Sequence, residues 1–173
     1  MRFPATRSVI RPTPDRVRET LFNWLQGRIA GTRCLDLFAG SGALGLEALS
    51  RGASEVVFVE SDAQAARCIA ETLKTLKSER GRVLTLDAFE HLRGPVQPYD
   101  VVFLDPPFAS GALERACQQL AVRGWLAPAG RIYLELPADA GEPPLPAGWQ
   151  LLRSKRAGEV GYHLAGLAAT DPA

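Results

Sequence analysis

Short apolar runs alternate with longer amphipathic stretches through most of the chain. The apolar runs cover residues 34–38, 56–60, 83–86, 101–104 and 131–136. Their continuous Val, Leu, Ile and Phe character is typical of strands buried on both faces. The stretches between them have helical character and cover residues 43–51, 63–77, 88–92 and 113–122. Strands that alternate with helices predict an α/β fold with a doubly wound, mostly parallel sheet.

The last part of the chain departs from this alternation. Residues 149–154 and 159–164 flank a short turn that contains Gly158, and this pattern predicts a hairpin. The hairpin would add an antiparallel strand from the C-terminal part of the chain to the open parallel sheet. The alanine-rich residues 165–173 are interpreted as a frayed tail. A chain of 173 residues fits one domain, so we expect residues 1–173 to form a single unit.

An amphipathic helix is predicted ahead of the first strand, within an N-terminal arm and helix of residues 1–27. Thr13 is a candidate N-cap, and Pro14 is favoured as the first helical residue. Gly27 is a reasonable end for the helix. An apolar stripe at helical spacing should face the sheet, and it comprises Val17, Leu21, Trp24 and Leu25.

Composition narrows the class of protein without naming a function. With 46% hydrophobic residues the chain can bury a core. Its net charge of +1 excludes a strongly positive electrostatic potential over the whole protein. Cys34, Cys68 and Cys117 are widely spread, with no metal-ligand spacing and no disulfide framework. This pattern predicts reduced thiols in the cytoplasm and no metal site. No apolar signal segment or membrane-spanning run is present, so no membrane partner is expected.

A glycine-rich loop follows the first predicted strand. Gly40, Gly42 and Gly45 have the G-x-G-x-x-G spacing, which lets the backbone turn sharply close to a ligand. Open α/β sheets bind ligands beyond the carboxyl ends of their strands. Glu60, at the end of the second strand, could accept hydrogen bonds from both hydroxyls of a ribose. This fingerprint fits NAD, with its pyrophosphate on the helix N-terminus, and it fits S-adenosylmethionine equally well.

Two features favour S-adenosylmethionine over NAD, namely Asp36 and an acceptor loop at Asp105 that has no evident role in hydride transfer, and a third acid, Asp87, is compatible with it. Asp36 directly precedes the loop, where it would repel a pyrophosphate but suit the ammonium group of a methionine moiety. Asp87 follows the third strand and could accept a hydrogen bond from an adenine amino group, while Ala88 offers a backbone donor to the ring. Each acid could instead be a helix cap or a solvated loop residue.

The fourth strand ends in Asp105-Pro106-Pro107-Phe108. Proline has no backbone N–H, so this loop presents acceptors, namely the Asp105 carboxylate and the Pro106 carbonyl. Phe108 adds a flat face on which a ring can stack. The combination suits a planar molecule with an exocyclic amine, such as a nucleobase. The alternative is an ordinary surface turn after a strand.

Taken together, these motifs resemble the bacterial 16S ribosomal RNA guanine-N2-methyltransferases of the RsmD type. The similarity lies in the Arg-Pro-Thr-Pro-Asp-Arg-Val-Arg-Glu-Thr stretch and its continuation through residues 11–25, and in the glycine loop within residues 34–49. It extends through Asp105 to Phe108 and on to residues 158–162, so it covers nearly the whole chain. The Asp-Pro-Pro-Phe sequence alone is shared with DNA adenine-N6 methyltransferases.

The resemblance implies a Rossmann-like class I methyltransferase fold with a seven-stranded sheet. It implies transfer of a methyl group from S-adenosylmethionine, leaving S-adenosylhomocysteine, to the N2 amine of guanine 966 in 16S ribosomal RNA. The substrate would be a small ribosomal subunit or an assembly intermediate, and the enzyme a monomer. Catalytic residues would be Asp105, Pro106, Pro107 and Phe108. Cofactor-binding residues would be Thr13, Asp36, Phe38, Ala39, Gly40, Ser41, Gly42, Glu60, Ser61, Asp87, Ala88 and Asp105.

Basic residues concentrate near the N-terminus, beside the predicted cofactor loop. We expect four of them to contact RNA phosphates, namely Arg7, Arg11, Arg16 and Arg18. Members of the family usually begin with a basic segment rich in Arg and Gly ahead of the part that matches residues 2–4. That segment is missing from this sequence, which predicts a weaker grip on RNA.

Three other functions stay open on sequence grounds. A DNA adenine-N6 methyltransferase would use the same acidic loop but needs a target-recognition region, for which the chain has little room. An NAD-dependent oxidoreductase is disfavoured by Asp36. A non-catalytic RNA-binding module is disfavoured by the intact loop from Asp105 to Phe108.

Overall fold

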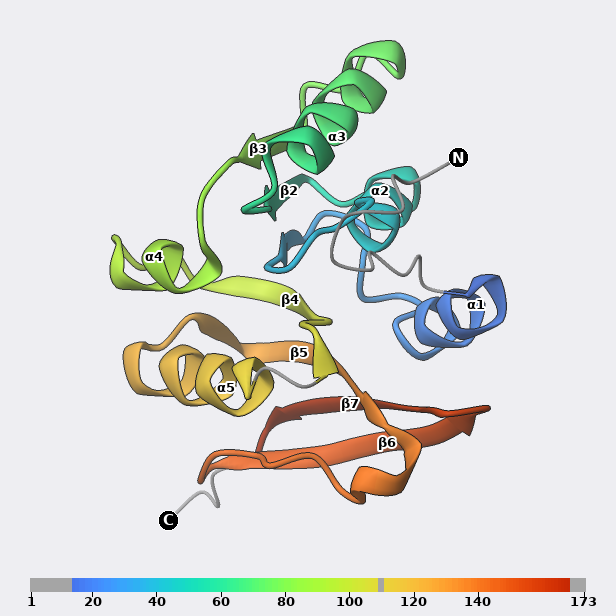
Figure 1. Ribbon diagram of the computed structural model, residues 1–173, viewed down its shortest axis with the longest axis vertical. Coiled ribbons are helices and arrows are strands. Elements are labelled where there is room, and N and C mark those ends of the chain that lie inside the picture. The colour runs from blue at the N-terminus through green and yellow to red at the C-terminus, as the bar shows by residue number, and fades with distance from the viewer. Residues whose placement is uncertain (1–13, 109–110, 169–173) are drawn as a thin grey trace.

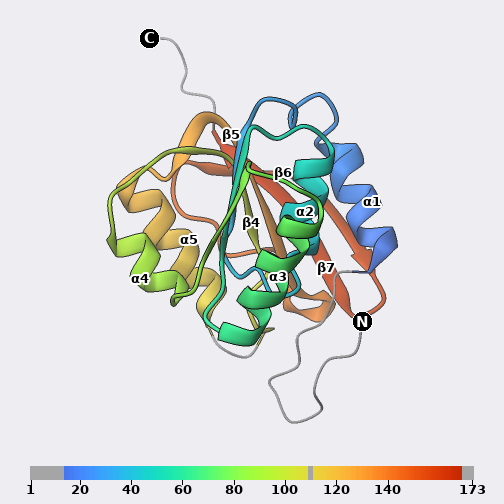
Figure 2. The same cartoon turned by 90° about the horizontal axis from the view of Figure 1, so that it is seen from above.

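The computed structural model describes residues 14–108 and 111–168, which form one seven-stranded sheet (Figures 1 and 2). The strand order is β3-β2-β1-β4-β5-β7-β6. Neighbours from β3 to β5 are parallel, and β7 pairs antiparallel with both β5 and β6. The mostly parallel sheet with a late antiparallel strand is therefore confirmed. The strands are β1 Arg33–Asp36, β2 Glu55–Val59, β3 Gly81–Leu84, β4 Tyr99–Leu104, β5 Leu126–Pro137, β6 Trp149–Ala157 and β7 Val160–Leu167.

Helices cover both faces of the sheet, as Figure 2 shows along its edge. One face carries α1, α2 and α3, whose buried side chains pack with Phe58, Phe103 and Tyr133. The other face carries α4 and α5, which pack with Leu35 and Val102. This double cover explains why the parallel strands are apolar on both sides. The helices are α1 Asp15–Trp24, α2 Ala43–Ser50, α3 Ala63–Thr75, α4 Ala88–Arg93 and α5 Ala112–Arg123, with a short 3₁₀ helix, η2, at Ala138–Ala140.

The chain ends differ in detail from the sequence predictions. Helix α1 begins at Asp15, so Pro14 takes the N-cap position instead of the first helical position, and Thr13 lies outside the described residues. The expected frayed tail from residue 165 is wrong for its first residues, because β7 continues to Leu167. Ala165 is fully buried in the core on the α4 and α5 side. Antiparallel pairing with β5 and β6 on either side holds this segment in the sheet.

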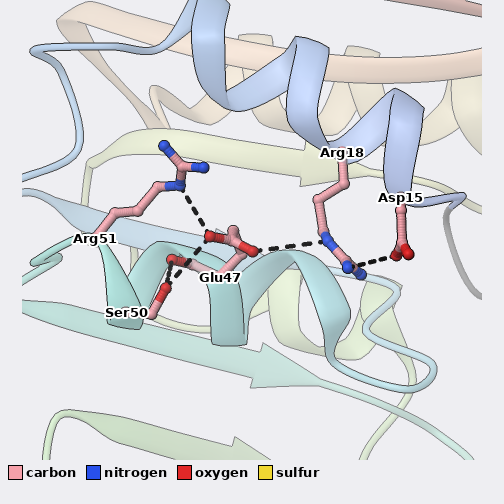
Figure 3. Close-up of polar contacts among 5 residues, drawn as sticks. All are labelled: Asp15, Arg18, Glu47, Ser50 and Arg51. Atoms are coloured by element: carbon pink, nitrogen blue, oxygen red, sulfur yellow. Dashed lines mark hydrogen bonds and ion pairs between the residues drawn. The ribbon is translucent and has the colours of Figure 1, made fainter.

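Helix α1 is fixed to the rest of the fold by aromatic packing and by ion pairs. Phe22 packs on Phe103 with ring centroids 5.9 Å apart, and Trp24 stacks on Tyr162 at 5.4 Å. Near the start of the helix the guanidinium of Arg18 ion-pairs with Glu47 of α2 at 3.7 Å (Figure 3). These contacts hold α1 over the same face of the sheet as α2.

Gly45 sets how closely α2 approaches the sheet. A Cβ atom at this position would lie 2.3 Å from Cε1 of Phe58 on β2. We expect Gly45→Ala to lower the free energy of unfolding by about 1–3 kcal/mol, because overpacking outweighs the gain in helix propensity. Urea denaturation would measure the change, with Glu71→Ala on the exposed side of α3 as the control. A midpoint as high as that of the wild type would contradict this account of the glycine.

Candidate active site

Four carboxylates gather at the carboxyl edge of the sheet. Side chains alternate between the faces of a strand, and the apolar residues two positions before each acid point to the α1, α2 and α3 face. The acids therefore lie on that same face, at the last residue of β1, just beyond the ends of β2 and β4, and near the end of β5. They are Asp36, Glu60, Asp105 and Glu135.

Asp36 is the most enclosed of the acids beside the glycine loop. Its side chain is 3% exposed, and it accepts a hydrogen bond from the backbone N–H of Gly45 at 3.1 Å. Burial raises the pKa of Asp36 from an ordinary 3.8 to about 7; the Gly45 hydrogen bond lowers this pKa, and the charge of Glu60 raises it. A cation placed here would favour the ionised carboxylate.

Glu60 organises the glycine loop. Its two carboxylate oxygens accept hydrogen bonds from the backbone N–H groups of Gly40, at 2.8 Å, and Asp62, at 2.7 Å. Gly40 and Gly42 both have positive φ, at 57° and 79°, which glycine adopts without strain. Each carboxylate oxygen can accept more than one hydrogen bond, so the predicted role of Glu60 toward ribose hydroxyls is compatible with these contacts.

Glu60→Ala should weaken binding of S-adenosylhomocysteine by about 1–3 kcal/mol, the range for lost hydrogen bonds to a charged group. The variant loses the acceptor for the ribose and also the contact that holds Gly40. Calorimetric titration measures the affinity, with Glu71→Ala as a surface control. Unchanged affinity would remove Glu60 from the cofactor site.

The other residues predicted for the cofactor line the same edge. Phe38 and Ser41 are half-buried, Ala39 is buried and Ser61 is exposed. The ring of Phe38 lies edge-on to Phe89 of α4 at 6.2 Å. The glycine loop and the start of α4 therefore face one another.

Asp87 is the N-cap of α4, as one of its two sequence interpretations proposed. One carboxylate oxygen accepts from the backbone N–H groups of Phe89, at 2.9 Å, and Glu90, at 3.3 Å. Asp87 is exposed, and Ala88 beside it is buried. Capping occupies one oxygen and leaves the adenine contact of Asp87 as a prediction.

The loop after β4 borders a small hollow of about 140 Å³. Pro106 is buried, whereas Pro107 is exposed and the Phe108 side chain is 42% exposed. An exposed aromatic ring beside a hollow is available to a flat ligand. The walls of the hollow include Pro106, Phe108, Leu113, Glu135, Leu136 and Pro144.

Asp105 meets a second acid that the sequence analysis missed. The parallel register pairs Leu104 with Leu134, so Asp105 and Glu135 come next to each other on adjacent strands. Burial raises the pKa of Asp105 well above 3.8, and the interaction with the neighbouring Glu135 raises it further. Two carboxyl groups in contact can share one proton in this way. The available sequence signal was a lone acid, Glu135, inside the apolar run of residues 131–136.

Tyr133 completes this cluster and was also missed. Its side chain is fully buried, and its hydroxyl makes no hydrogen bond of normal geometry. Burial raises the pKa of Tyr133 well above 10, and the nearby charges of Glu135 and Asp105 raise it further. A buried hydroxyl thus lies beside two acids with its hydrogen-bonding capacity unused.

The basic residues predicted to contact RNA divide into three cases. Arg16 is exposed on α1. Arg18 is engaged by Asp15 at 2.7 Å and by Glu47 at 3.7 Å, which gives it a structural role between α1 and α2 (Figure 3). Arg7 and Arg11 lie outside the described residues. The N-terminal RNA surface therefore remains a prediction.

Two general properties of the described ranges, 14–108 and 111–168, bear on the site. No group of three or more His, Cys, Asp or Glu side chains in them could hold a metal ion. None of the helices there combines the length and apolar character needed to cross a membrane.

The charge of this edge decides which cofactor fits. Among the described residues, no lysine or arginine forms an ion pair with Asp36, Glu60, Asp105 or Glu135. Such an edge repels a pyrophosphate and attracts a ligand that carries positive charge. S-adenosylmethionine carries a sulfonium and an ammonium group, so the residues present fit it, whereas they do not fit NAD.

Comparison with known proteins agrees with this geometry. A family model described as conserved hypothetical protein 95 matches residues 2–166. Ribosomal RNA small subunit methyltransferase D of Escherichia coli strain K12 is 48% identical over 155 residues, covering 90% of this chain and 78% of its own. The protein of the same name from Haemophilus influenzae is 47% identical over 161 residues, covering 90% and 82%.

Solved structures show the same relationship. The structure of yhhF from Escherichia coli has a TM-score of 0.88 and 45% identity, covering 96% of this chain and 92% of its own. TrmN from Thermus thermophilus, at 24% identity and a TM-score of 0.71, covers 88% of this chain and 48% of its own, and shares the Rossmann-like class I fold. The chain belongs to the conserved hypothetical protein 95 family, the RsmD type of methyltransferase.

Proposed function

We propose that this protein transfers a methyl group from S-adenosylmethionine to the N2 amine of a guanine in small-subunit ribosomal RNA, at position 966. The observation that carries the proposal is the set of carboxylates at one sheet edge that no described cation neutralises. Asp36 and Glu60 lie at the glycine loop, and Asp105 begins the loop with Phe108. One group of acids suits a cationic donor and the other an amine acceptor.

The chain itself supplies acceptors, alignment and a stacking surface. When bound, S-adenosylmethionine supplies an electrophilic methyl group on its sulfonium. Asp105 and the Pro106 carbonyl accept hydrogen bonds from the N2 amine, which favours a more pyramidal nitrogen and frees its lone pair. As the nitrogen takes the methyl group it gives up one proton, which the ionised Asp105 carboxylate accepts. Because the target base must leave its stack, the exposed ring of Phe108 provides a replacement surface. Catalysis then rests on positioning and electrostatics.

Contacts to RNA phosphates are proposed for the N-terminal region. Exposed Arg16, together with Arg7 and Arg11, would hold the backbone without reading its sequence. We further propose that the substrate is a cytoplasmic small subunit or its assembly intermediate, and that the protein acts as a monomer. Arg18 would contribute to the same contacts, and its ion pairs with Asp15 and Glu47 hold it between α1 and α2.

Mass spectrometry of digested ribosomal RNA tests the proposed reaction. The chain is expressed in a host that lacks its own enzyme, and the RNA is compared with that of the host alone. We expect N2-methylguanine, mapped to one guanine. Detection of N6-methyladenine without N2-methylguanine would support the adenine alternative that the Asp-Pro-Pro-Phe sequence leaves open, and would overturn the guanine assignment.

A further inference from the structure

Glu135 is a buried acid that lines the same hollow as the Asp105 loop. Its side chain is 5% exposed, and it borders the hollow together with Pro106 and Phe108. The β4–β5 register places it next to Asp105 on the adjacent strand. The hollow is therefore bordered by one buried acid, by the loop that Asp105 begins and by the exposed ring of Phe108, with Asp105 itself next to Glu135 in the sheet.

The edge of a guanine base offers two neighbouring donors, N1–H and the N2 amine. Adenine has an acceptor at N1 and carries its amine at another position. We propose that Glu135 accepts the N1–H of the target base while Asp105 accepts from N2, so that the two acids form a guanine-recognition site. This inference rests on the proposed function and adds the residue that selects the base.

The hydroxyl of Tyr133 is a second observation that points to a ligand here. It is fully buried beside Glu135 and Asp105, and it makes no normal hydrogen bond. Such a group destabilises the fold unless a partner arrives. When a base binds, its two N–H donors replace the proton shared by the acids, and that proton leaves to solvent. Tyr133 then donates to the fully ionised Glu135, and we assign it as a positioning residue.

A purely structural role explains these residues poorly. A buried pair of acids without a neutralising cation is less stable than apolar side chains of similar volume. The residues around the pair are apolar and well packed, including Phe103 and Leu134. Local departures from such packing concentrate at functional sites.

The test uses two target bases that share the reacting amine. Small-subunit RNA is built by ligation with either guanine or 2,6-diaminopurine at the mapped position, and is assembled with the subunit proteins. Both bases carry a 2-amine, but 2,6-diaminopurine has an acceptor at N1. We expect the wild type to methylate guanine at least about a hundredfold faster, because a site built for a donor rejects a base that lacks it.

Glu135→Gln changes the acceptor into a group that can also donate. We expect the preference of this variant for guanine over 2,6-diaminopurine to fall at least about tenfold, in part because it methylates 2,6-diaminopurine faster than the wild type does. Glu159→Gln, in the exposed β6–β7 turn, makes the same substitution away from the site and should keep the preference. In Glu135→Gln, the preference for guanine RNA in binding affinity, measured by fluorescence anisotropy without cofactor, should fall as the preference in rate does.

Tyr133→Phe should lower the affinity for guanine RNA, while the melting temperature of this variant stays equal to or above that of the wild type.

The outcomes separate this inference from the proposed function. Product N2-methylguanine with an unchanged base preference in Glu135→Gln leaves the proposed function standing and overturns the role of Glu135. Equal wild-type rates on the two bases would also overturn the role of Glu135. The inference can therefore be tested even if the Glu135→Gln protein does not fold. If the wild type forms no N2-methylguanine, the proposed function falls, and the recognition site falls with it.

Discussion

Asp105→Ala should lower methyl transfer to small-subunit RNA by about 10²–10³-fold while binding of S-adenosylhomocysteine stays nearly unchanged. The size corresponds to the loss of one hydrogen-bonding group that acts on the reacting centre. Asp105 touches the amine in the proposed mechanism, whereas Asp36 and Glu60 at the glycine loop serve the cofactor. A loss confined to the rate of transfer is the signature of an interaction made in the transition state.

Incorporation of tritiated methyl groups measures the rate for Asp105→Ala, and calorimetry measures the cofactor affinity. Asp139→Ala, an exposed acid in η2, is the matched control and should behave as the wild type does. Near-normal turnover in Asp105→Ala would refute the assignment of this acid to the amine. Equal loss of cofactor binding and of turnover would move Asp105 to the cofactor site.

Affinity for S-adenosylhomocysteine should rise about tenfold between pH 6 and pH 8, because Asp36 ionises in this interval. Burial holds its pKa at about 7 in the free protein, and only the ionised carboxylate attracts the ligand's ammonium group. In Asp36→Asn we expect weaker binding at pH 8 and a flat pH profile for this contribution. Calorimetric titrations at a series of pH values measure both. A variant that keeps the wild-type slope would exclude Asp36 as the titrating group.

The stability of the free protein should show the opposite dependence on pH. The folded-state pKa of Asp36 is raised from 3.8 to about 7, so in this window the folded state holds a proton that the unfolded state has lost. The contribution of Asp36 to stability is therefore fully present below about pH 4 and is lost as the pH rises through 7. Asp36→Asn should thus melt at a higher temperature than the wild type at pH 8, with a smaller difference at pH 5. A higher melting temperature for the wild type at pH 8 would contradict the buried, unpaired state of this acid.

Local sequence patterns determined the strands, the helices and most of the glycine loop of this protein. Apolar runs marked β1, β2 and β4, and parallel strands place their carboxyl ends at one edge of a sheet. A short motif directly after each run, such as Asp36 with the glycine loop or Asp105 with its prolines, is therefore visible along the chain. A functional residue at the end of a strand can therefore be recognised from the sequence without knowing which strand lies beside it.

Only the tertiary structure decided which side chains work together. Glu135 lies thirty positions beyond Asp105, and their contact depends on the register between β4 and β5, which backbone hydrogen bonds and packing set jointly. Arg18 is predicted from its charge to contact RNA, and the structure adds a partner that the sequence did not indicate, Glu47 of α2. The segment that begins at Ala165 looked like a tail, yet pairing on both sides makes it part of the sheet. In each case the deciding contact joins segments distant in sequence, and such contacts arise from packing that no local pattern of residues records.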